Sequence, residues 1–423
     1  MDRLVIRPNG PLHGRVRVQG AKNSALKLMA ACLLAEGRHE LRNVPRIVDV
    51  EIMSEMLRAV GASVDREGPT LFIEVPAVEG LVPVAPYELV DKMRASIVVL
   101  GPLLARCGEA RISMPGGDDF GSRPINFHID GLAQMGTRFV TRHGFIEGSV
   151  GPDPAHRRLV GTKVVLEYPS HTTTDNLMMA AALASGTTVI ENAAREPEVC
   201  DLAGYLNEMG ARVRGSGTSR LEITGVDALE SGTHSVVPDR VVAGTLAAAT
   251  AIAGGEVELV EARADHMEMY TTKLRSMGVE IEAREGSIWV GADGSLESAD
   301  VATLPYPGVA TDYKPMVVTM LAVAQGVAIV TENLFEGRFR YVDELRRMGA
   351  DIRTEGHHAV VRGVKRLSGA QVRSPDIRGG AALVLAGLVA EGETVLTDAH
   401  HLDRGYEDLA GMLSSLGGDV RRA

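Results

Sequence analysis

The stretch Leu345-Arg346-Arg347-Met348-Gly349 decides the fold, because a phrase of this form occurs six times along the 423-residue chain. Each copy reads Leu-x-x-apolar-Gly, and the copies end at Gly61, Gly136, Gly210, Gly278, Gly349 and Gly417, about 70 residues apart. Such a phrase is typical of the last turn of a helix closed by glycine. An alternating stretch such as 350–352 follows it and predicts a strand. The chain therefore contains six related units.

A second short phrase, such as Val323-Ala324-Gln325-Gly326, also occurs six times and lies out of phase with the first. Its copies end at Gly37, Gly108, Gly186, Gly255, Gly326 and Gly392. The segments before it, for example 25–34 and 381–386, are apolar on nearly all sides, which indicates buried helices. Each unit thus holds one buried helix and one amphipathic helix. A chain of this length exceeds a single core, so we expect an α/β fold of six βαβ-type repeats, three in each of two domains.

The composition indicates a globular protein and limits its partners. Hydrophobic residues make up 45% of the chain, charged residues make up 23%, and the formal net charge is −11. An acidic chain is a poor nucleic-acid scaffold, although clustered cations can still bind a small anion. The N-terminus lacks the apolar region of a signal peptide, and no uncharged run is long enough to cross a membrane. We therefore expect an intracellular protein with no membrane or nucleic-acid partner.

Polar residues open every predicted buried helix, and most of them are cationic. They are Lys22-Asn23, Arg94, Thr174-Asp175-Asn176, Asp239-Arg240, Asp312-Tyr313-Lys314 and Asp376-Ile377-Arg378. Helix N-termini carry partial positive charge and unpaired N–H groups, so added cations favour a bound anion. If the helices direct these ends toward an interdomain cleft, the cleft would bind phosphate and carboxylate groups. The alternative is that these residues are ordinary caps and solvated charges.

The loop 115–124 combines three glycines, two acids and an arginine. Gly116, Gly117 and Gly121 suggest hinge freedom, while Asp118 and Asp119 offer a proton donor. This composition fits a mobile lid that delivers an acid to a reacting group. A simple turn is the alternative interpretation.

Six motifs along the chain resemble the UDP-N-acetylglucosamine enolpyruvyl transferases, also called UDP-N-acetylglucosamine 1-carboxyvinyltransferases. The motifs are Gly20-Ala21-Lys22-Asn23, Met93-Arg94-Ala95-Ser96, Pro115-Gly116-Gly117 with Gly121-Ser122-Arg123-Pro124, residues 191–198, Thr311-Asp312, and residues 401–407. The enolpyruvylshikimate phosphate synthases resemble the chain in the six-unit fold but lack this set. The resemblance implies a two-domain inside-out α/β barrel. Residues 1–20 and 236–423 would form one domain, and residues 21–235, with the lid, would form the other.

The resemblance also implies an activity. The enzyme would transfer the enolpyruvyl (carboxyvinyl) group of phosphoenolpyruvate to the 3-hydroxyl of UDP-N-acetylglucosamine by addition–elimination and release phosphate. This reaction is the first committed step of peptidoglycan precursor synthesis and takes place in the cytoplasm. It requires no metal and no cofactor.

The resemblance assigns roles to individual residues of this chain. Asp312 would be the general base at the acceptor hydroxyl, and Asp118 would be the proton donor, where most members carry Cys. The phosphoenolpyruvate anion would be bound by Lys22, Arg123 and Arg404, with Arg94 and Arg378 in support. Asn23 would contact the sugar, and the nucleotide would lie against Pro124, Ile125, Asn126, Phe127, His128 and Ser170, with His171 beside it.

Two segments depart from the family pattern, and both are expected to face the acceptor. His171-Thr172-Thr173-Thr174-Asp175-Asn176 stands where the family usually has Val-Gly-Ala-Thr-Glu-Asn, and Tyr313-Lys314 stands where it usually has Leu-Gln. His171 and Lys314 are therefore candidates to bind an extra or repositioned phosphate. Two alternatives stay open: transfer to another uridine nucleotide such as UMP, and a non-catalytic relative that binds a nucleotide sugar. Asp118 in place of Cys predicts resistance to the epoxide fosfomycin.

Overall fold

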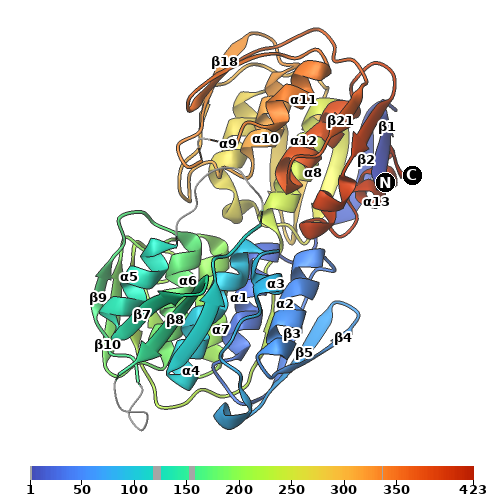
Figure 1. Cartoon of the computed structure of the whole chain (residues 1–423). Helices are drawn as coiled ribbons and strands as arrows, with labels where there is room; N and C mark the ends of the chain where they lie inside the picture. The colour runs from blue at the N-terminus through green and yellow to red at the C-terminus, as the bar shows by residue number, and fades with distance from the viewer. Residues whose placement is uncertain (1, 118–124, 152–157, 336) are drawn as a thin grey trace. The chain divides into compact units, whose positions relative to one another are not determined.

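The computed structural model describes residues 2–117, 125–151, 158–335 and 337–423. Two compact units account for these residues: residues 2–19 with 238–423 form unit 1, and residues 20–117 with 125–237 form unit 2. Asp118, Arg123 and Pro124 lie outside the described residues, as does Asp119. Each unit is coloured by residue number in Figure 1.

Unit 2 has three inner helices surrounded by sheets and outer helices (Figure 1). The inner helices of its described residues are α1 (Lys22–Cys32), α4 (Leu100–Cys107), which continues η2 (Arg94–Val99), and α6 (His171–Ala182). The outer helices are α2 (Val48–Ala59), α5 (Asn126–Gln134) and α7 (Pro197–Glu208), and two short turns are η1 (Val78–Gly80) and α3 (Tyr87–Val90). Sheet order is β13-β3-β5-β4, β6-β8-β7 and β11-β12-β10-β9. The strands are β3 (Gly37–Arg42), β4 (Ser63–Glu67), β5 (Thr70–Val75), β6 (Glu109–Ser113), β7 (Thr137–Arg142), β8 (Phe145–Val150), β9 (Lys163–Val165), β10 (Thr187–Glu191), β11 (Arg212–Arg214), β12 (Arg220–Thr224) and β13 (Thr233–Ser235).

Unit 1 repeats this plan in its described residues. The inner helices are α8 (Arg240–Ala253), α10 (Lys314–Leu321) and α12 (Ile377–Gly387), and the outer helices are α9 (Glu268–Ser276), α11 (Tyr341–Arg347) and α13 (Leu409–Ser415), with η4 (Ala264–His266) and η5 (Ala399–Arg404). Sheet order is β15-β16-β14-β2, β17-β18-β20-β19 and β21-β22-β1-β23. The strands are β1 (Arg3–Arg7), β2 (Leu12–Arg17), β14 (Gly255–Val260), β15 (Glu280–Arg284), β16 (Ser287–Ala292), β17 (Val301–Ala302), β18 (Val327–Thr331), β19 (Asp351–Glu355), β20 (His358–Arg362), β21 (Gln371–Arg373), β22 (Thr394–Thr397) and β23 (Asp419–Arg422). The predicted α/β fold with three repeats per domain is confirmed.

The N-terminal strands belong to unit 1 although they precede unit 2 in the chain. Strand β1 pairs antiparallel with β22 and β23, and β2 pairs parallel with β14. Each N-terminal strand fills a position in a sheet whose other strands come from the C-terminal half. The chain therefore crosses from unit 1 to unit 2 and back.

The recurring glycines have left-handed backbone conformations, and the first set ends helices as its spacing predicts. The six glycines of the first phrase all have φ between 90° and 106°, a left-handed conformation that side chains with a Cβ disfavour. Those of the second phrase also have positive φ, from 68° to 110°. The first set therefore follows the six outer helices as predicted. In the second set Gly108 caps α4, whereas Gly37 and Gly255 begin strands, and Gly186, Gly326 and Gly392 lie between an inner helix and the next strand.

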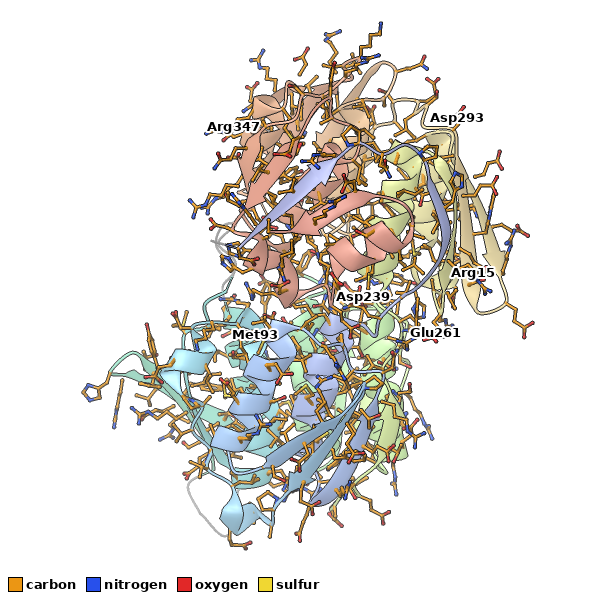
Figure 2. The ribbon with its side chains drawn as sticks, turned by 90° about the vertical axis from the view of Figure 1, so that its right-hand side faces the viewer. Arg15, Met93, Asp239, Glu261, Asp293 and Arg347 are labelled. Atoms are coloured by element: carbon orange, nitrogen blue, oxygen red, sulfur yellow. The ribbon has the colours of Figure 1, made fainter. Side chains whose placement is uncertain are left out.

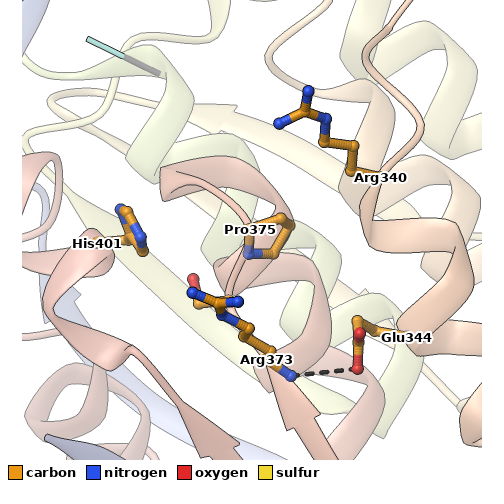
Figure 3. Close-up of a pocket in the computed structure, with 6 residues that line it drawn as sticks. Arg340, Glu344, Arg373, Pro375 and His401 are labelled. Atoms are coloured by element: carbon orange, nitrogen blue, oxygen red, sulfur yellow. Dashed lines mark hydrogen bonds between the residues drawn. The ribbon is translucent and has the colours of Figure 1, made fainter. Parts of the chain in front are cut away.

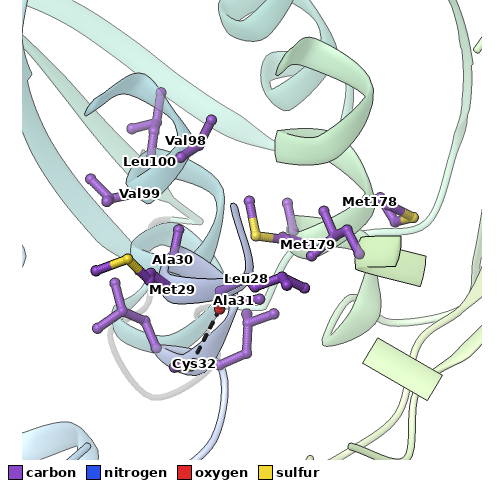
Figure 4. Packing of buried hydrophobic residues seen from close by; sticks show 14 of the residues in the cluster. Leu28, Met29, Ala30, Ala31, Cys32, Val98, Val99, Leu100, Met178 and Met179 are labelled. Atoms are coloured by element: carbon purple, nitrogen blue, oxygen red, sulfur yellow. Dashed lines mark hydrogen bonds between the residues drawn. The ribbon is translucent and has the colours of Figure 1, made fainter. Parts of the chain in front are cut away.

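The inner helices are buried nearly all round. In α1 every residue except Asn23 is buried, and in α12 all residues are buried. Figure 4 shows Leu28 and Met29 of α1 among Val98 of η2 and Met179 of α6. Charged side chains such as Arg15 and Arg347, by contrast, project from the surface of unit 1 (Figure 2). Apolar helices inside and sheets outside give the inside-out barrel its core.

The strand pairing and one helix start add detail to the predicted fold. The sheets are mixed, because each parallel pair joined through a helix is extended by an antiparallel hairpin, as in β9, β10 and β12. Helix α6 begins at His171, three residues earlier than predicted, because Ser170 accepts a hydrogen bond from the Thr173 N–H and caps the helix there. In the described part of the chain, no helix is both long and apolar enough to cross a membrane.

Candidate active site

A carboxylate and two arginines meet in unit 1 at the start of two inner helices. Asp312 lies just before α10, and its Oδ1 accepts a hydrogen bond from Arg338 Nη2 at 2.6 Å. Arg378, in the first turn of α12, places Nε 3.7 Å from Asp312 Oδ2. Both arginines are at most 5% exposed, whereas the Asp312 side chain is 24% exposed. The Asp312 carboxylate is thus partly open to solvent, while the two guanidinium groups that face it are buried.

The charges around Asp312 decide its protonation state. Burial acts to raise the pKa of Asp312, but the charges of Arg338 and Arg378 and the hydrogen bond from Arg338 outweigh it. The pKa is held well below the ordinary range of a carboxyl group. Asp312 is therefore ionised at neutral pH, as a proton acceptor must be.

Lys314 does not take the role that the sequence suggested for it. Its side chain is fully buried, and its Nζ lies 2.9 Å from Glu332 Oε2. A phosphate group cannot reach an ammonium group that the protein core encloses and pairs. The prediction of an extra phosphate contact by Lys314 is therefore wrong.

In unit 2, Lys22 lies at the first position of α1. Its Nζ is 2.6 Å from Asp49 Oδ2, and the two side chains are 10% and 2% exposed. The N-cap residue of α1, Ala21, makes no side-chain hydrogen bond to the helix. The neighbouring Asn23 is half-buried. Asp49 orients the lysine that the sequence assigned to the donor phosphate.

The predicted nucleotide-lining residues of unit 2 gather around the start of α5 and α6. Ile125 and His128 are buried, Phe127 and Ser170 are half-buried, and Asn126 is exposed. His128 Nδ1 accepts from Asn176 Nδ2 at 3.0 Å. His171, half-buried, lies 3.3 Å from the buried carboxylate of Asp175. The structure thus brings His128 and His171 to adjoining helices.

The remaining described residues of the prediction are Arg94 and Arg404. Arg94 donates to the Pro115 carbonyl at 3.1 Å, and Arg404, at the end of η5, is half-buried. Gly116 has a reason other than hinge freedom: a Cβ on it would lie 1.8 Å from the Asp91 carbonyl oxygen. The glycine is required by this close approach at the base of the loop.

The sequence of the whole chain is similar to known proteins of one enzyme family. The family model described as EPSP synthase (3-phosphoshikimate 1-carboxyvinyltransferase) matches residues 6–413. A protein of Symbiobacterium thermophilum, named UDP-N-acetylglucosamine 1-carboxyvinyltransferase 1, is 49% identical over 100% of this chain and 95% of its own length. A protein of Granulibacter bethesdensis with the name UDP-N-acetylglucosamine 1-carboxyvinyltransferase is 47% identical over 100% and 99% of the two chains.

The chain belongs to the UDP-N-acetylglucosamine 1-carboxyvinyltransferase family. The family predicted from the motifs, and the prediction that the chain is an enzyme, are thereby confirmed. Solved structures agree in fold. The enolpyruvyl transferase NikO from Streptomyces tendae matches with a TM-score of 0.89 at 24% identity, over 100% of this chain and 99% of that one. EPSP synthase from Acinetobacter baumannii matches with a TM-score of 0.75 at 19% identity, over 100% of both chains.

Sequence reasoning missed Arg338 and Asp49 in this family member. Arg338 lies in the segment between β18 and α11, and Asp49 lies in the first turn of the outer helix α2, so neither opens one of the buried helices. The available signal was chemical: an ionised, partly buried carboxylate such as Asp312 needs a cation, and a buried Lys22 needs an anion. Among the described residues, no group of three or more His, Cys, Asp or Glu side chains could hold a metal ion.

A pocket of about 330 Å³ in unit 1 is distinct from the Asp312 cluster. It is lined by Arg340, Glu344, Arg373, Ser374, Pro375 and His401 (Figure 3). The Arg373 N–H donates to Glu344 inside it, and Arg373 Nε is bonded to Asp398. Acidic partners therefore accompany Arg373, and none of the predicted site residues lines the pocket.

His128 gives a prediction about acid stability. Burial and the charge of Arg94 lower the pKa of His128 from 6.5 to about 3. Between these values the unfolded chain binds a proton that the folded chain does not, so stability falls as pH falls through this window. Urea unfolding should show that His128→Gln loses about 1.4 kcal/mol less per pH unit than wild type in that window. Parallel slopes in the two proteins would mean that His128 is not held neutral by the fold.

Proposed function

We propose that the protein transfers the enolpyruvyl group of phosphoenolpyruvate to the 3-hydroxyl of UDP-N-acetylglucosamine and releases phosphate. The observation that carries this proposal is the 46–49% identity, along the whole chain, to proteins named UDP-N-acetylglucosamine 1-carboxyvinyltransferase. The reaction is the first committed step of peptidoglycan precursor synthesis, and it takes place in the cytoplasm. The ionised Asp312 and the cations Lys22 and Arg378 suit the base and anion-binding roles of this reaction.

In the addition step, Asp312 takes the proton of the acceptor 3-hydroxyl while that oxygen bonds to C2 of phosphoenolpyruvate. A proton from Asp118 adds to C3 at the same time, so the double bond is consumed and a tetrahedral adduct forms. Positive charge builds on C2 as C3 is protonated, and a base, an acid and bound anions in fixed positions lower that barrier.

In the elimination step, the bond between C2 and the phosphate oxygen breaks and inorganic phosphate leaves. C3 returns a proton to the Asp118 carboxylate, which restores the double bond in the transferred group, and the proton that Asp312 took in the addition step leaves with the phosphate. We assign phosphate and carboxylate binding to Lys22, Arg123 and Arg404, with Arg94, Arg338 and Arg378 in support. Asn23, His171 and the residues 124–128 and 170 are assigned to the acceptor.

Acceptor identity is tested by phosphate release from phosphoenolpyruvate with UDP-N-acetylglucosamine or UMP as the second substrate. UDP-N-acetylglucosamine should support turnover and UMP should not. His171, which departs from the family, is the observation that favours UMP as a second candidate. Faster phosphate release with UMP would transfer the assignment to that nucleotide.

Lys22 provides a test of the donor site. Lys22→Ala should lower kcat/KM for phosphoenolpyruvate by on the order of 100-fold, because a buried cation that binds a multiply charged donor is lost. The change also removes the ammonium group that lies 2.6 Å from the buried Asp49 carboxylate. Lys22→Met with Asp49→Asn removes both charges and keeps the volume, so it separates donor binding from stability. Near-normal kcat/KM in this double variant would contradict the role of Lys22.

A further inference from the structure

A buried ion pair lies directly behind the proposed base. Lys314, the first residue of α10, and Glu332, just after β18, both have fully buried side chains, and their charged atoms are 2.9 Å apart. Removing two charges from water is costly, and mutual attraction offsets that cost only when further hydrogen bonds complete the site. The contacts of the two side chains therefore show what the pair holds in place.

Glu332 is a fully satisfied acceptor. Its Oε1 accepts from the Thr303 hydroxyl at 2.9 Å and from the Leu334 N–H at 2.8 Å, and its Oε2 accepts from the Thr311 hydroxyl at 2.7 Å. These bonds tie the residue before Asp312 to the start of the segment that carries Arg338. Glu332 thus joins the two sides of the Asp312–Arg338 contact.

Lys314 holds the other end of the same segment. Its Nζ donates to the Arg338 carbonyl at 2.6 Å and lies 3.8 Å from the centre of the Phe339 ring. One ammonium group therefore binds both the carboxylate of Glu332 and the main chain of Arg338. Thr311 links Glu332 to the Arg338 side chain as well, because its hydroxyl oxygen accepts a hydrogen bond from Arg338 Nη1 at 3.0 Å.

We propose that Lys314 is a positioning residue for enolpyruvyl transfer, which fixes the guanidinium of Arg338 against Asp312 through Glu332, Thr311 and the Arg338 main chain. The inference rests on the proposed function, in which Asp312 accepts the acceptor proton. A guanidinium group sets the orientation of a carboxylate only if its own main chain is fixed. Lys314 supplies that fixation.

The charges that face this network determine the sign of its pH effect. Asp312 faces Arg338 from the segment before α11, Arg378 from α12 and Arg240 from α8. Lys314 faces Glu332, Arg338 and Asp376, and burial lowers its pKa to about 8, so it is charged at neutral pH. If Arg338 loses its support, it lowers the pKa of Asp312 less. The acid limb of the rate profile then moves to higher pH.

Lys314→Met tests the proposal because it retains an unbranched side chain of similar volume and removes the charge. We expect kcat to fall about tenfold and the acid limb of kcat/KM to move up by about one pH unit. The melting temperature should also fall, since Glu332 stays buried without a counter-charge. Lys273→Met is the matched control, because Lys273 of α9 is half-buried and donates to the Asp300 carbonyl, outside the Asp312 cluster.

The double variant Lys314→Met/Glu332→Gln separates positioning from stability. It removes the unpaired carboxylate, so the melting temperature should recover, while kcat stays low and the acid limb stays displaced. If kcat and the acid limb return to wild-type values together with the melting temperature, Lys314 only stabilises the fold and the proposal is overturned. Asp312→Asn tests the proposed function separately from the role of Lys314. Full activity of Asp312→Asn would contradict the base role of Asp312, whatever the result with Lys314.

Discussion

Asp312→Asn is expected to lower kcat by on the order of 10³-fold, because the variant retains the shape of the side chain but cannot accept the proton of the acceptor hydroxyl. The loss should appear in kcat rather than in KM, since the carboxylate acts during addition. Initial-rate measurements of phosphate release with both substrates saturating would measure this loss.

The control for this variant must account for the two arginines that face Asp312. Asparagine leaves Arg338 and Arg378 buried without a full counter-charge, so the melting temperature should also fall. Asp343→Asn is the matched substitution, because Asp343 is 74% exposed and bonded to Arg346. Asp343→Asn should keep wild-type kcat. A normal kcat in Asp312→Asn would remove Asp312 from the chemistry.

The wild-type protein is expected to resist fosfomycin, and the Asp118→Cys variant is expected to be inactivated covalently and rapidly by it. A thiolate opens an epoxide readily, whereas a carboxylate is a far weaker nucleophile. The variant should keep turnover, since a thiol is also a proton donor, while Asp118→Asn should abolish it. Mass spectrometry of the fosfomycin-treated proteins measures the adduct directly.

Asp119 provides the internal comparison for this prediction, because it is the adjacent acid in the same loop. Asp119→Cys should remain resistant to fosfomycin if Asp118 is the lid acid. Covalent modification of wild type, or full activity of Asp118→Asn, would instead assign the proton donor to Asp119.

The sequence predicted those parts of the fold that follow from periodic patterns. The glycines at 61, 136, 210, 278, 349 and 417 all follow helices and have positive φ. Glycine adopts this left-handed conformation most readily, so its position after an apolar run marks a helix end. The burial of α1 and α12 followed from their apolar composition on all sides. These signals are local, so a single sequence carries them.

The candidate site was only partly predictable, because its contacts join segments that are remote in sequence. Arg338 reaches Asp312 from a non-helical segment 26 residues later, and nothing in that segment indicates the direction of its side chain. Lys314 was expected to bind phosphate, since a lysine at a helix start suggests an anion site. Its partner Glu332 is 18 residues away and is brought to it only by the packing of β18 beside α10. The carboxylate that each of these two cations pairs with therefore became known only from the tertiary structure.

The identity of the product is the most direct test of the central claim. The purified protein should be incubated with phosphoenolpyruvate and UDP-N-acetylglucosamine, and the nucleotide product should be analysed by NMR and mass spectrometry alongside released phosphate. We predict a UDP-N-acetylglucosamine enolpyruvyl ether at the 3-oxygen, formed in equal amount to phosphate. Phosphate release without this ether, or an unchanged UDP-N-acetylglucosamine in the presence of folded protein, would contradict the account.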